Sequence, residues 1–196
     1  MIATCAVDTV PYAWVEQARP GAVILTPWGT EWENTGLLRL TVDPSGESAE
    51  GRIVDWATFM MRRQQRLDIR DEPEDFEAVA ERGTVPDDVD LADFLSDDAR
   101  FAVGLRVPYT RRWLELNDSG YLDTLWLLAP GAWASVCDDV VRQAGSRRLW
   151  DEAVAGYHWW RQVGKPSRGT YQGTVTAATG QTVWLSGTAV ATKPET

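Results

Sequence analysis

Hydrophobic and polar residues follow two different periods in the first third of the chain. Residues 2–7 and 22–26 are short, mostly apolar runs, a pattern typical of strands that are covered on both faces. Between them Val10, Trp14 and Val15 recur at helical spacing, and a proline and a glycine then end the pattern. The first 26 residues are therefore predicted to form a strand, a helix and a second strand.

The pattern changes after a polar loop that follows residue 30. Residues 37–42 and 51–61 are separated by Asp43-Pro44-Ser45-Gly46, a run of residue types typical of a turn. We expect an antiparallel hairpin here, and we assign residues 1–66 to one mixed α/β region.

The next segment is strongly acidic. Residues 68–98 carry 13 acidic side chains against Arg70 and Arg82, a net charge of −11, whereas the whole chain has a formal net charge of −10. The rest of the chain is therefore close to neutral and has no concentrated basic face. Tight nucleic-acid binding normally needs such a face, so we expect no nucleic-acid partner.

The acidic segment also carries signals of helix ends. Pro73, followed by apolar residues on one face, then Arg82 and Gly83, predicts a short helix over residues 73–82. A second short helix is expected over residues 87–95. Residues 67–100 are interpreted as an acidic helical connector.

The last part of the chain is predicted to be an α+β extension over residues 101–190. Ser146 is expected to cap its longest helix, which ends before Gly164 and Pro166. The expected strands are runs of apolar and β-branched residues, of which the last two form a hairpin: 101–107, 121–128, 174–177 and 182–185.

Composition narrows the class of protein. Hydrophobic residues make up 44% and charged residues 24% of the chain, which is typical of folded, water-soluble proteins. The apolar runs are far shorter than the roughly 20 residues that a membrane-spanning helix needs. The N-terminus has no signal-peptide pattern, so a cytoplasmic location is expected, with Cys5 and Cys137 as free thiols.

The chain contains 11 tryptophans, seven of them in residues 101–185. Large aromatic side chains serve either as core residues or as stacking surfaces for a partner. We favour the core, and we expect Trp150 to be buried there.

Several motifs in residues 1–66 resemble the protein-L-isoaspartate O-methyltransferase family. They are a first strand with small residues, a Val-Pro pair, a helix that ends with Pro-Gly and a strand that ends with Pro-x-Gly: Ile2-Ala3-Thr4-Cys5-Ala6-Val7, Val10-Pro11, Glu16-Gln17, Arg19-Pro20-Gly21 and Val23-Ile24-Leu25-Thr26-Pro27-Trp28-Gly29-Thr30. Ala22 stands where the family usually has a second glycine. The resemblance implies an α/β fold, the C-terminal part of a Rossmann-like class I methyltransferase sheet followed by the α+β extension.

The extension resembles that of a bacterial subgroup of the same family. The motifs that carry this second resemblance are Arg147-Arg148-Leu149-Trp150-Asp151-Glu152, Trp159-Trp160 and Thr182-Val183-Trp184-Leu185. Some members of the subgroup are similar to enzymes that methylate aspartate in precursor peptides. The resemblance therefore implies a protein or peptide substrate with an aspartyl or isoaspartyl carboxylate.

Enzymes of this class hold S-adenosylmethionine over a glycine-rich strand-turn-helix, with an acidic residue on the next strand. No Gly-x-Gly spacing occurs in this chain, and Met1 stands where the family's fourth strand begins. The resemblance thus implies a chain without the cofactor-binding half, either because its annotated start lies too late or because it works with a partner. We expect that the chain alone does not bind S-adenosylmethionine tightly.

The resemblance also gives candidate site residues. Thr4 and Cys5, at the carboxyl end of the first strand, are candidates for contact with the methyl donor or the peptide, and they are equally compatible with simple packing. Pro27, Trp28 and Gly29 end the neighbouring strand and are candidates for the substrate cleft, although Trp28 is also compatible with the core.

The family's peptide-contacting strand corresponds to a second group of candidates, Phe59, Met61 and Arg62. This match is loose because the family usually has Phe-Val-Pro-Leu there, and Arg62 is also compatible with a solvent-facing position. The single histidine, His158, has no partners at metal-ligand spacing, so no metal site is predicted.

Two hypotheses of function follow. The first is an S-adenosylmethionine-dependent protein carboxyl O-methyltransferase of the isoaspartyl or aspartyl type, present as an N-terminally truncated chain that is not active alone. The second is a non-catalytic module that binds a peptide or completes a partner's domain. Because an open strand edge invites pairing, a homodimer is also expected.

Overall fold

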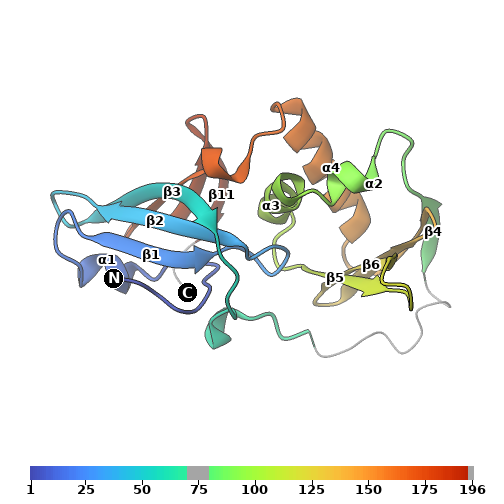
Figure 1. Ribbon diagram of the computed structural model, residues 1–196, viewed down its shortest axis with the longest axis horizontal. Helices are drawn as coiled ribbons and strands as arrows, with labels where there is room; N and C mark the ends of the chain where they lie inside the picture. Colours follow the sequence, from blue (N-terminus) through green and yellow to red (C-terminus); the bar gives the residue numbers. More distant parts are fainter. Residues whose placement is uncertain (70–79, 194–196) are drawn as a thin grey trace. The chain divides into compact units, whose positions relative to one another are not determined.

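The computed structural model describes residues 1–69 and 80–193, in which the chain divides into two compact units (Figure 1). The first unit comprises Met1–Arg66 and Lys165–Thr196, and the second comprises Leu67–Gly164. Residues 165–193, which the sequence grouped with the extension, thus belong with the N-terminal region. Both units are mixed α/β structures built on an antiparallel sheet.

The first unit contains a six-stranded sheet with the order β1-β2-β3-β9-β10-β11. Its strands are β1 Val23–Trp28, β2 Gly36–Val42, β3 Ser48–Trp56, β9 Gln172–Thr176, β10 Gly180–Leu185 and β11 Thr188–Lys193. All neighbouring strands are antiparallel. The Rossmann-like part of the expected fold is therefore not confirmed.

Residues 2–7 form isolated parallel bridges instead of the regular strand that was expected. Ile2 and Val7 pair with β1, at Leu25 and Trp28, and Ala6 pairs with Met61. Helix α1 (Tyr12–Glu16) follows and is short, with Val15 as its buried residue. The predicted order of an apolar segment, a helix and a strand is confirmed, but the first segment is too irregular to be a strand.

The hairpin of β2 and β3 is confirmed, with its turn at residues 43–46. The Asp43 carboxylate accepts hydrogen bonds from the backbone N–H groups of Glu47 and Ser48, and Ser45 donates its hydroxyl to it. The bond from Ser45 is the main cause that lowers the pKa of Asp43. Gly46 takes a φ of +80°, which favours glycine.

The C-terminal hairpin is also confirmed, and it extends the sheet of the first unit. Strand β9 pairs with β3, β10 pairs with β9, and β11 adds an edge strand that the sequence did not predict. One face of the sheet buries the core of the unit, whose members include Val10, Val15, Ile24, Trp28, Leu38, Leu40, Val42, Ile53, Tyr171, Val175 and Val183.

The second unit contains a five-stranded sheet with the order β4-β8-β7-β6-β5. Its strands are β4 Glu81–Thr84, β5 Arg111–Leu116, β6 Leu122–Ala129, β7 Ala132–Cys137 and β8 Val140–Gly145. The helices are α2 Leu91–Phe94, α3 Asp97–Arg106 and α4 Leu149–Gln162. Helix α4 packs against α3 and against strands β6, β7 and β8.

Two expectations for the second unit are wrong. Residues 101–107 are not a strand but lie mostly in α3, which is buried along one continuous stretch. A helix that is covered on most sides has the same apolar run as a buried strand, so hydrophobicity alone does not separate the two. Arg82 and Gly83 lie in strand β4 rather than at a helix end, and most of the helix expected there falls outside the described residues.

The longest helix, α4, is confirmed, but its first residue is later than expected. Ser146 does not cap it: the Ser146 hydroxyl donates to the carbonyl oxygen of Gly131, and Arg148 occupies the N-cap position. Along one side of α4, Leu149, Ala153, Gly156 and Trp160 are buried, whereas Val163, just after its last residue, is exposed.

Aromatic rings form the centre of the second unit. The ring of Phe94 lies 5.4 Å from Trp150 and 5.6 Å from Tyr157, and Tyr157 lies 6.0 Å from Trp160, measured between centroids. Trp150 is only 2% exposed, as expected, whereas Trp113 on the edge strand β5 is 60% exposed. The tryptophans therefore serve partly as core and partly as surface.

Candidate functional site

Residues 4–7 are held between two other groups of sequence-predicted site residues. The N–H of Val7 donates to the carbonyl oxygen of Pro27 at 3.0 Å, and the N–H of Arg62 donates to the carbonyl oxygen of Ala6 at 2.8 Å. Within this segment Thr4 is exposed and Cys5 is half-buried. The three groups of candidates thus meet at one edge of the first unit's sheet.

Pro27, Trp28 and Gly29 are buried, so they do not line an open cleft. The indole N–H of Trp28 donates to the Oε1 atom of Gln181 at 3.0 Å. A Cβ atom on Gly29 would lie 2.2 Å from the carbonyl oxygen of Glu33, so this glycine allows the chain to pack against itself. Trp28 and Gly29 therefore have a structural role in this geometry.

The last group is more accessible. Phe59 is exposed, Arg62 is half-buried, and Met61 is buried beside Ala6. The backbone carbonyl of Phe59 accepts a hydrogen bond from the Asn34 side chain.

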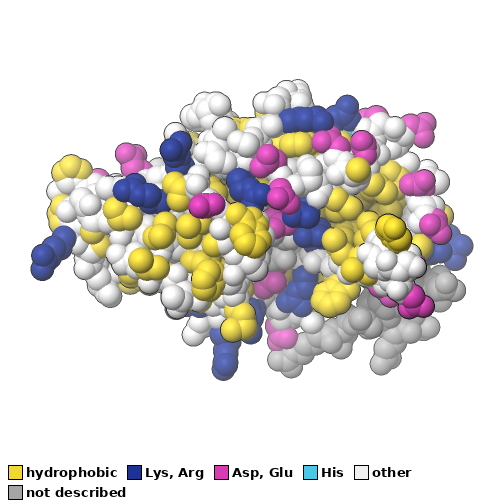
Figure 2. Space-filling model, in the orientation of Figure 1, with side chains coloured by type: hydrophobic (Ala, Val, Ile, Leu, Met, Phe, Trp, Pro, Cys, Tyr) yellow, Lys and Arg dark blue, Asp and Glu magenta, His cyan; other side chains and the backbone are white. Residues whose placement is uncertain are grey.

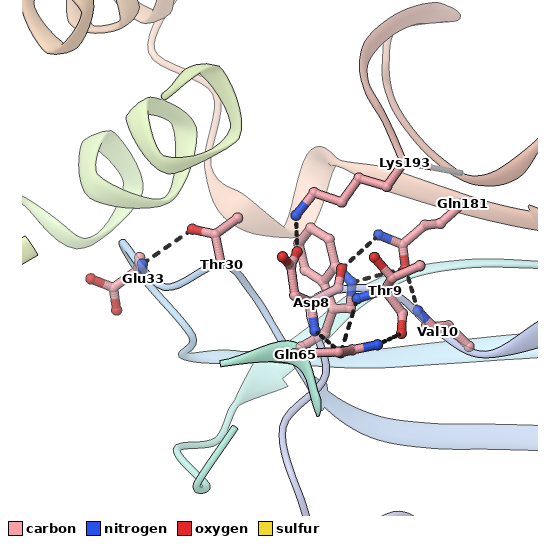
Figure 3. A network of polar contacts seen from close by, with 9 residues as sticks. Asp8, Thr9, Val10, Thr30, Glu33, Gln65, Gln181 and Lys193 are labelled. Carbon is pink, nitrogen blue, oxygen red and sulfur yellow. Dashed lines mark hydrogen bonds and ion pairs between the residues drawn. The ribbon is translucent and has the colours of Figure 1, made fainter. Parts of the chain in front are cut away.

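A polar network that sequence reasoning missed lies next to these residues (Figure 3). The buried side chain of Gln181 accepts hydrogen bonds from the N–H of Val10 and from Trp28, and donates to the carbonyl oxygen of Asp8. Gln65 accepts from the N–H of Asp8 and donates to the carbonyl oxygen of Thr9 at 2.7 Å. Two glutamines thus hold the chain between residues 8 and 10.

The same network contains an ion pair between the side chains of Asp8 and Lys193 (Figure 3). Burial lowers the pKa of Lys193 to about 8. The neighbouring carboxylate acts in the opposite direction, because it favours the charged ammonium. Both side chains are largely buried and face each other, so the pair connects the segment after residue 7 with strand β11. Because the effect of burial on Lys193 exceeds that of the carboxylate, its charged form is destabilised in the folded unit.

The second unit has its own polar cluster on helix α4. The Tyr157 hydroxyl donates to the Asp93 carboxylate at 2.7 Å, and the Arg161 guanidinium lies over the Tyr157 ring. Burial, and then the bond to Asp93, raise the pKa of Tyr157 to about 12. His158 pairs with Asp88 at 3.1 Å.

Within residues 1–69 and 80–193, no group of three or more His, Cys, Asp or Glu side chains is placed to hold a metal ion. In the same ranges, no helix is long and apolar enough to cross a membrane.

The candidate cofactor residues do not form a cradle for S-adenosylmethionine. The space beside Gly29, the glycine after β1, is occupied by the backbone of Glu33 and Asn34. Thr4 is exposed. Strand β1 is followed by a turn in which the N–H of Thr30 donates to the carbonyl oxygen of Glu33, rather than by a helix whose N-terminus is open to a ligand. The end of strand β1 and the turn after it therefore offer no cradle for this cofactor.

Large hydrophobic side chains of the first unit are exposed on the N-terminal segment, on strand β3 and on the segment that follows β3. Met1, Ile2, Val54, Trp56 and Met60 are all exposed, Trp56 by 60% and Met60 by 78%. Figure 2 shows hydrophobic side chains gathered over strands β1 to β3, among basic and acidic ones. Exposed hydrophobic side chains of this size are common at protein-binding surfaces.

Comparisons with known proteins give one distant similarity. No protein-family model matches the chain. No curated protein matches it either. Among solved structures, a protein-L-isoaspartate O-methyltransferase is similar with a TM-score of 0.41 and 16% identity, over 93% of this chain and 52% of that one. This chain thus spans about half of that protein's length, and a similarity at this TM-score shows nothing about activity.

Proposed function

We propose that this chain binds the protein or peptide substrate of a carboxyl O-methyltransferase of the isoaspartyl or aspartyl type. The observation that supports the proposal is the edge at which residues 4–7 run parallel to β1 and beside Met61. The motifs of the resemblance, which are distant along the chain, meet there. Thr4, Cys5, Phe59 and Arg62 are the accessible residues of this edge, and we assign substrate contact to them.

The reaction places few demands on the protein's side chains. Methyl transfer to a carboxylate is an in-line displacement by a group that is already ionised at neutral pH, so positioning is the main requirement. A binding part without a strong base is compatible with this chemistry. Because the end of strand β1 and the turn after it offer no cradle for S-adenosylmethionine, we propose that the methyl donor is held by another chain or segment.

A second candidate is a non-catalytic module that binds a partner and takes no part in methylation. The observation that favours it is the exposure of five large hydrophobic side chains of the first unit: Met1, Ile2, Val54, Trp56 and Met60. We propose that a second copy of this chain binds to these exposed side chains. For either function the proposed compartment is the cytoplasm, where the free thiols of Cys5 and Cys137 are stable.

Calorimetric titration separates the two candidates. We expect an isoaspartyl peptide to bind to the chain, a matched peptide with asparagine to bind less tightly, and S-adenosylmethionine to give no binding heat at micromolar concentrations. Substitution Arg62→Gln is expected to weaken peptide binding, whereas Arg63→Gln, an exposed neighbour, leaves it unchanged. If both peptides bind equally, or if neither binds, the substrate-binding role is contradicted and the partner-binding module is favoured. Micromolar binding of S-adenosylmethionine contradicts the assignment of the methyl donor to another chain or segment.

A further inference from the structure

A groove of about 570 Å³ lies on the face of the first unit's sheet that points away from the core. It crosses strands β2, β3 and β9 and is lined by Arg39, Thr41, Glu50, Gly51, Arg52, Val54, Gln172, Gly173 and Thr174. This volume lies within the range of roughly 300 to 1,000 Å³ that is typical of ligand sites.

The register of the strands builds the walls and the floor of this groove. Arg39 pairs with Arg52, which pairs with Gln172, so that these three side chains form one row across the strands. A second row consists of Thr41, Glu50 and Thr174. Between the rows, Gly51 and Gly173 pair with each other, and the backbone of the strands forms the floor. A Cβ atom on Gly173 would point to the opposite, buried face, 3.6 Å from Leu38.

The two arginines lie directly opposite each other on neighbouring antiparallel strands. Like charges in this position destabilise a sheet, because nothing between them neutralises the repulsion. Arg39 donates a hydrogen bond to the Thr41 hydroxyl at 3.3 Å, and neither guanidinium forms an ion pair with a carboxylate of the described residues. The arrangement is that of a site for an anion.

The charge of the groove indicates which anion it takes. Glu50 is the one acidic residue of the lining, so two arginines against one glutamate leave a single positive charge. A carboxylate, with one negative charge, matches this balance, whereas a phosphate dianion does not. The planar guanidinium also binds carboxylates with paired hydrogen bonds.

The size and the remaining lining residues favour a carboxylate that is part of a protein segment. The groove is much larger than a carboxylate group alone. Gln172 and Thr174 offer amide and hydroxyl groups for hydrogen bonds to a main chain, and Val54, which is 43% exposed, offers an apolar contact. We propose that this groove binds an acidic segment of a partner protein, with one aspartate or glutamate side chain held between Arg39 and Arg52. This inference rests on the groove alone and not on the proposed function.

The test uses the whole chain and a short peptide with blocked ends and a single aspartate. We expect the peptide to bind, and a matched peptide with asparagine to bind at least about tenfold more weakly, because a charge-assisted hydrogen bond is lost. Arg39→Gln and Arg52→Gln are each expected to weaken binding about tenfold. Arg19→Gln, an exposed arginine away from the groove, is the matched control and leaves binding unchanged.

Glu50→Gln gives a result of the opposite sign. It removes the negative charge from the groove and is expected to tighten binding of the aspartate peptide severalfold. Melting curves of each variant show that the fold is retained. Equal binding of the aspartate and asparagine peptides, or unchanged binding by both arginine variants, overturns the proposal. Tighter binding of inorganic phosphate than of the aspartate peptide overturns the choice of a carboxylate. If Arg62→Gln does not weaken binding of the isoaspartyl peptide, the proposed function fails, but the results expected for the groove stay the same.

Discussion

The Asp8 carboxylate and the Lys193 ammonium form a largely buried ion pair that joins the segment after residue 7 to the last strand, β11. Gln181, on β10, holds the same segment through the carbonyl oxygen of Asp8. The N-terminal segment is thus fixed to strands that come from the other end of the sequence.

Lys193 is predicted to make the stability of the first unit depend on pH. Its pKa falls from 10.5 to about 8 on folding, so between these values the unfolded chain binds the proton more tightly than the folded chain. The free energy of unfolding is therefore expected to rise as pH increases through this window, by about 1 to 3 kcal/mol. Urea denaturation of wild type and Lys193→Met at several pH values measures the difference.

The control for this experiment is Lys165→Met, which changes the other, exposed lysine and is expected to keep the wild-type pH dependence. The pKa of Tyr157 is raised from 10.0 to about 12 in the folded state, so its contribution to the free energy of unfolding decreases above pH 10.0. This decrease is expected to be the same in every variant. A Lys193→Met protein with the same pH dependence as wild type contradicts the prediction.

Gln181 is predicted to be a strong determinant of stability. It is 2% exposed and serves three polar groups, so Gln181→Met leaves the N–H of Val10, the indole of Trp28 and the carbonyl of Asp8 without this partner. Each buried group left unsatisfied costs about 1 to 3 kcal/mol. We expect chemical denaturation to show a loss of at least about 3 kcal/mol, and almost none for Gln17→Met at an exposed position. Equal stability of the two variants argues against the network.

Trp150 and Trp113 are predicted to respond in opposite ways to truncation. Trp150→Ala removes a buried ring that contacts Phe94 and is expected to destabilise the second unit by roughly 3 to 5 kcal/mol. Trp113→Ala, at an exposed position of β5, is expected to change stability by less than about 0.5 kcal/mol. Thermal denaturation followed by tryptophan fluorescence measures both, and an unchanged melting temperature for Trp150→Ala would show that this ring is not part of the core.

The exposed hydrophobic side chains of the first unit are predicted to mediate self-association. We expect light scattering to give twice the monomer mass of 21.9 kDa, and Trp56→Ser combined with Met60→Ser to give the monomer. Val163→Ser, an exposed apolar residue of the second unit, is the control and keeps the dimer. A wild-type monomer at all accessible concentrations contradicts the prediction.

The sequence predicts local elements better than it predicts which elements share a sheet. The hairpin of β2 and β3 and that of β9 and β10 are encoded in alternating residues around a turn, so they are visible in short windows. The pairing of β3 with β9 joins residues on either side of the second unit, and no local pattern encodes it. The sequence of helix α3 predicts a strand instead, because a helix that is buried on most sides has a continuous apolar run.

In the candidate site, too, contacts that are local in sequence are predictable and contacts between distant segments are not. The position of residues 4–7 beside β1 follows from the apolar runs and the intervening helix. The network around Gln181 was missed because its partners lie far away in sequence; Trp28 and Gln181 are 153 positions apart. A glutamine on the inward-facing, otherwise apolar side of a strand is the one local signal that such partners exist. The groove at Arg39 and Arg52 depends on strand register, which the sequence leaves open.

The second unit is inserted between two neighbouring strands of the first, since β3 precedes it and β9 follows it. This connectivity sets an order for folding during synthesis. The second unit is complete when residue 164 has been made, whereas β9, β10 and β11 emerge from the ribosome afterwards. Until then the edge of β3 has no partner on one side, so the nascent N-terminal hairpin is exposed to chaperones or to other chains for the time that about a hundred residues take to be translated.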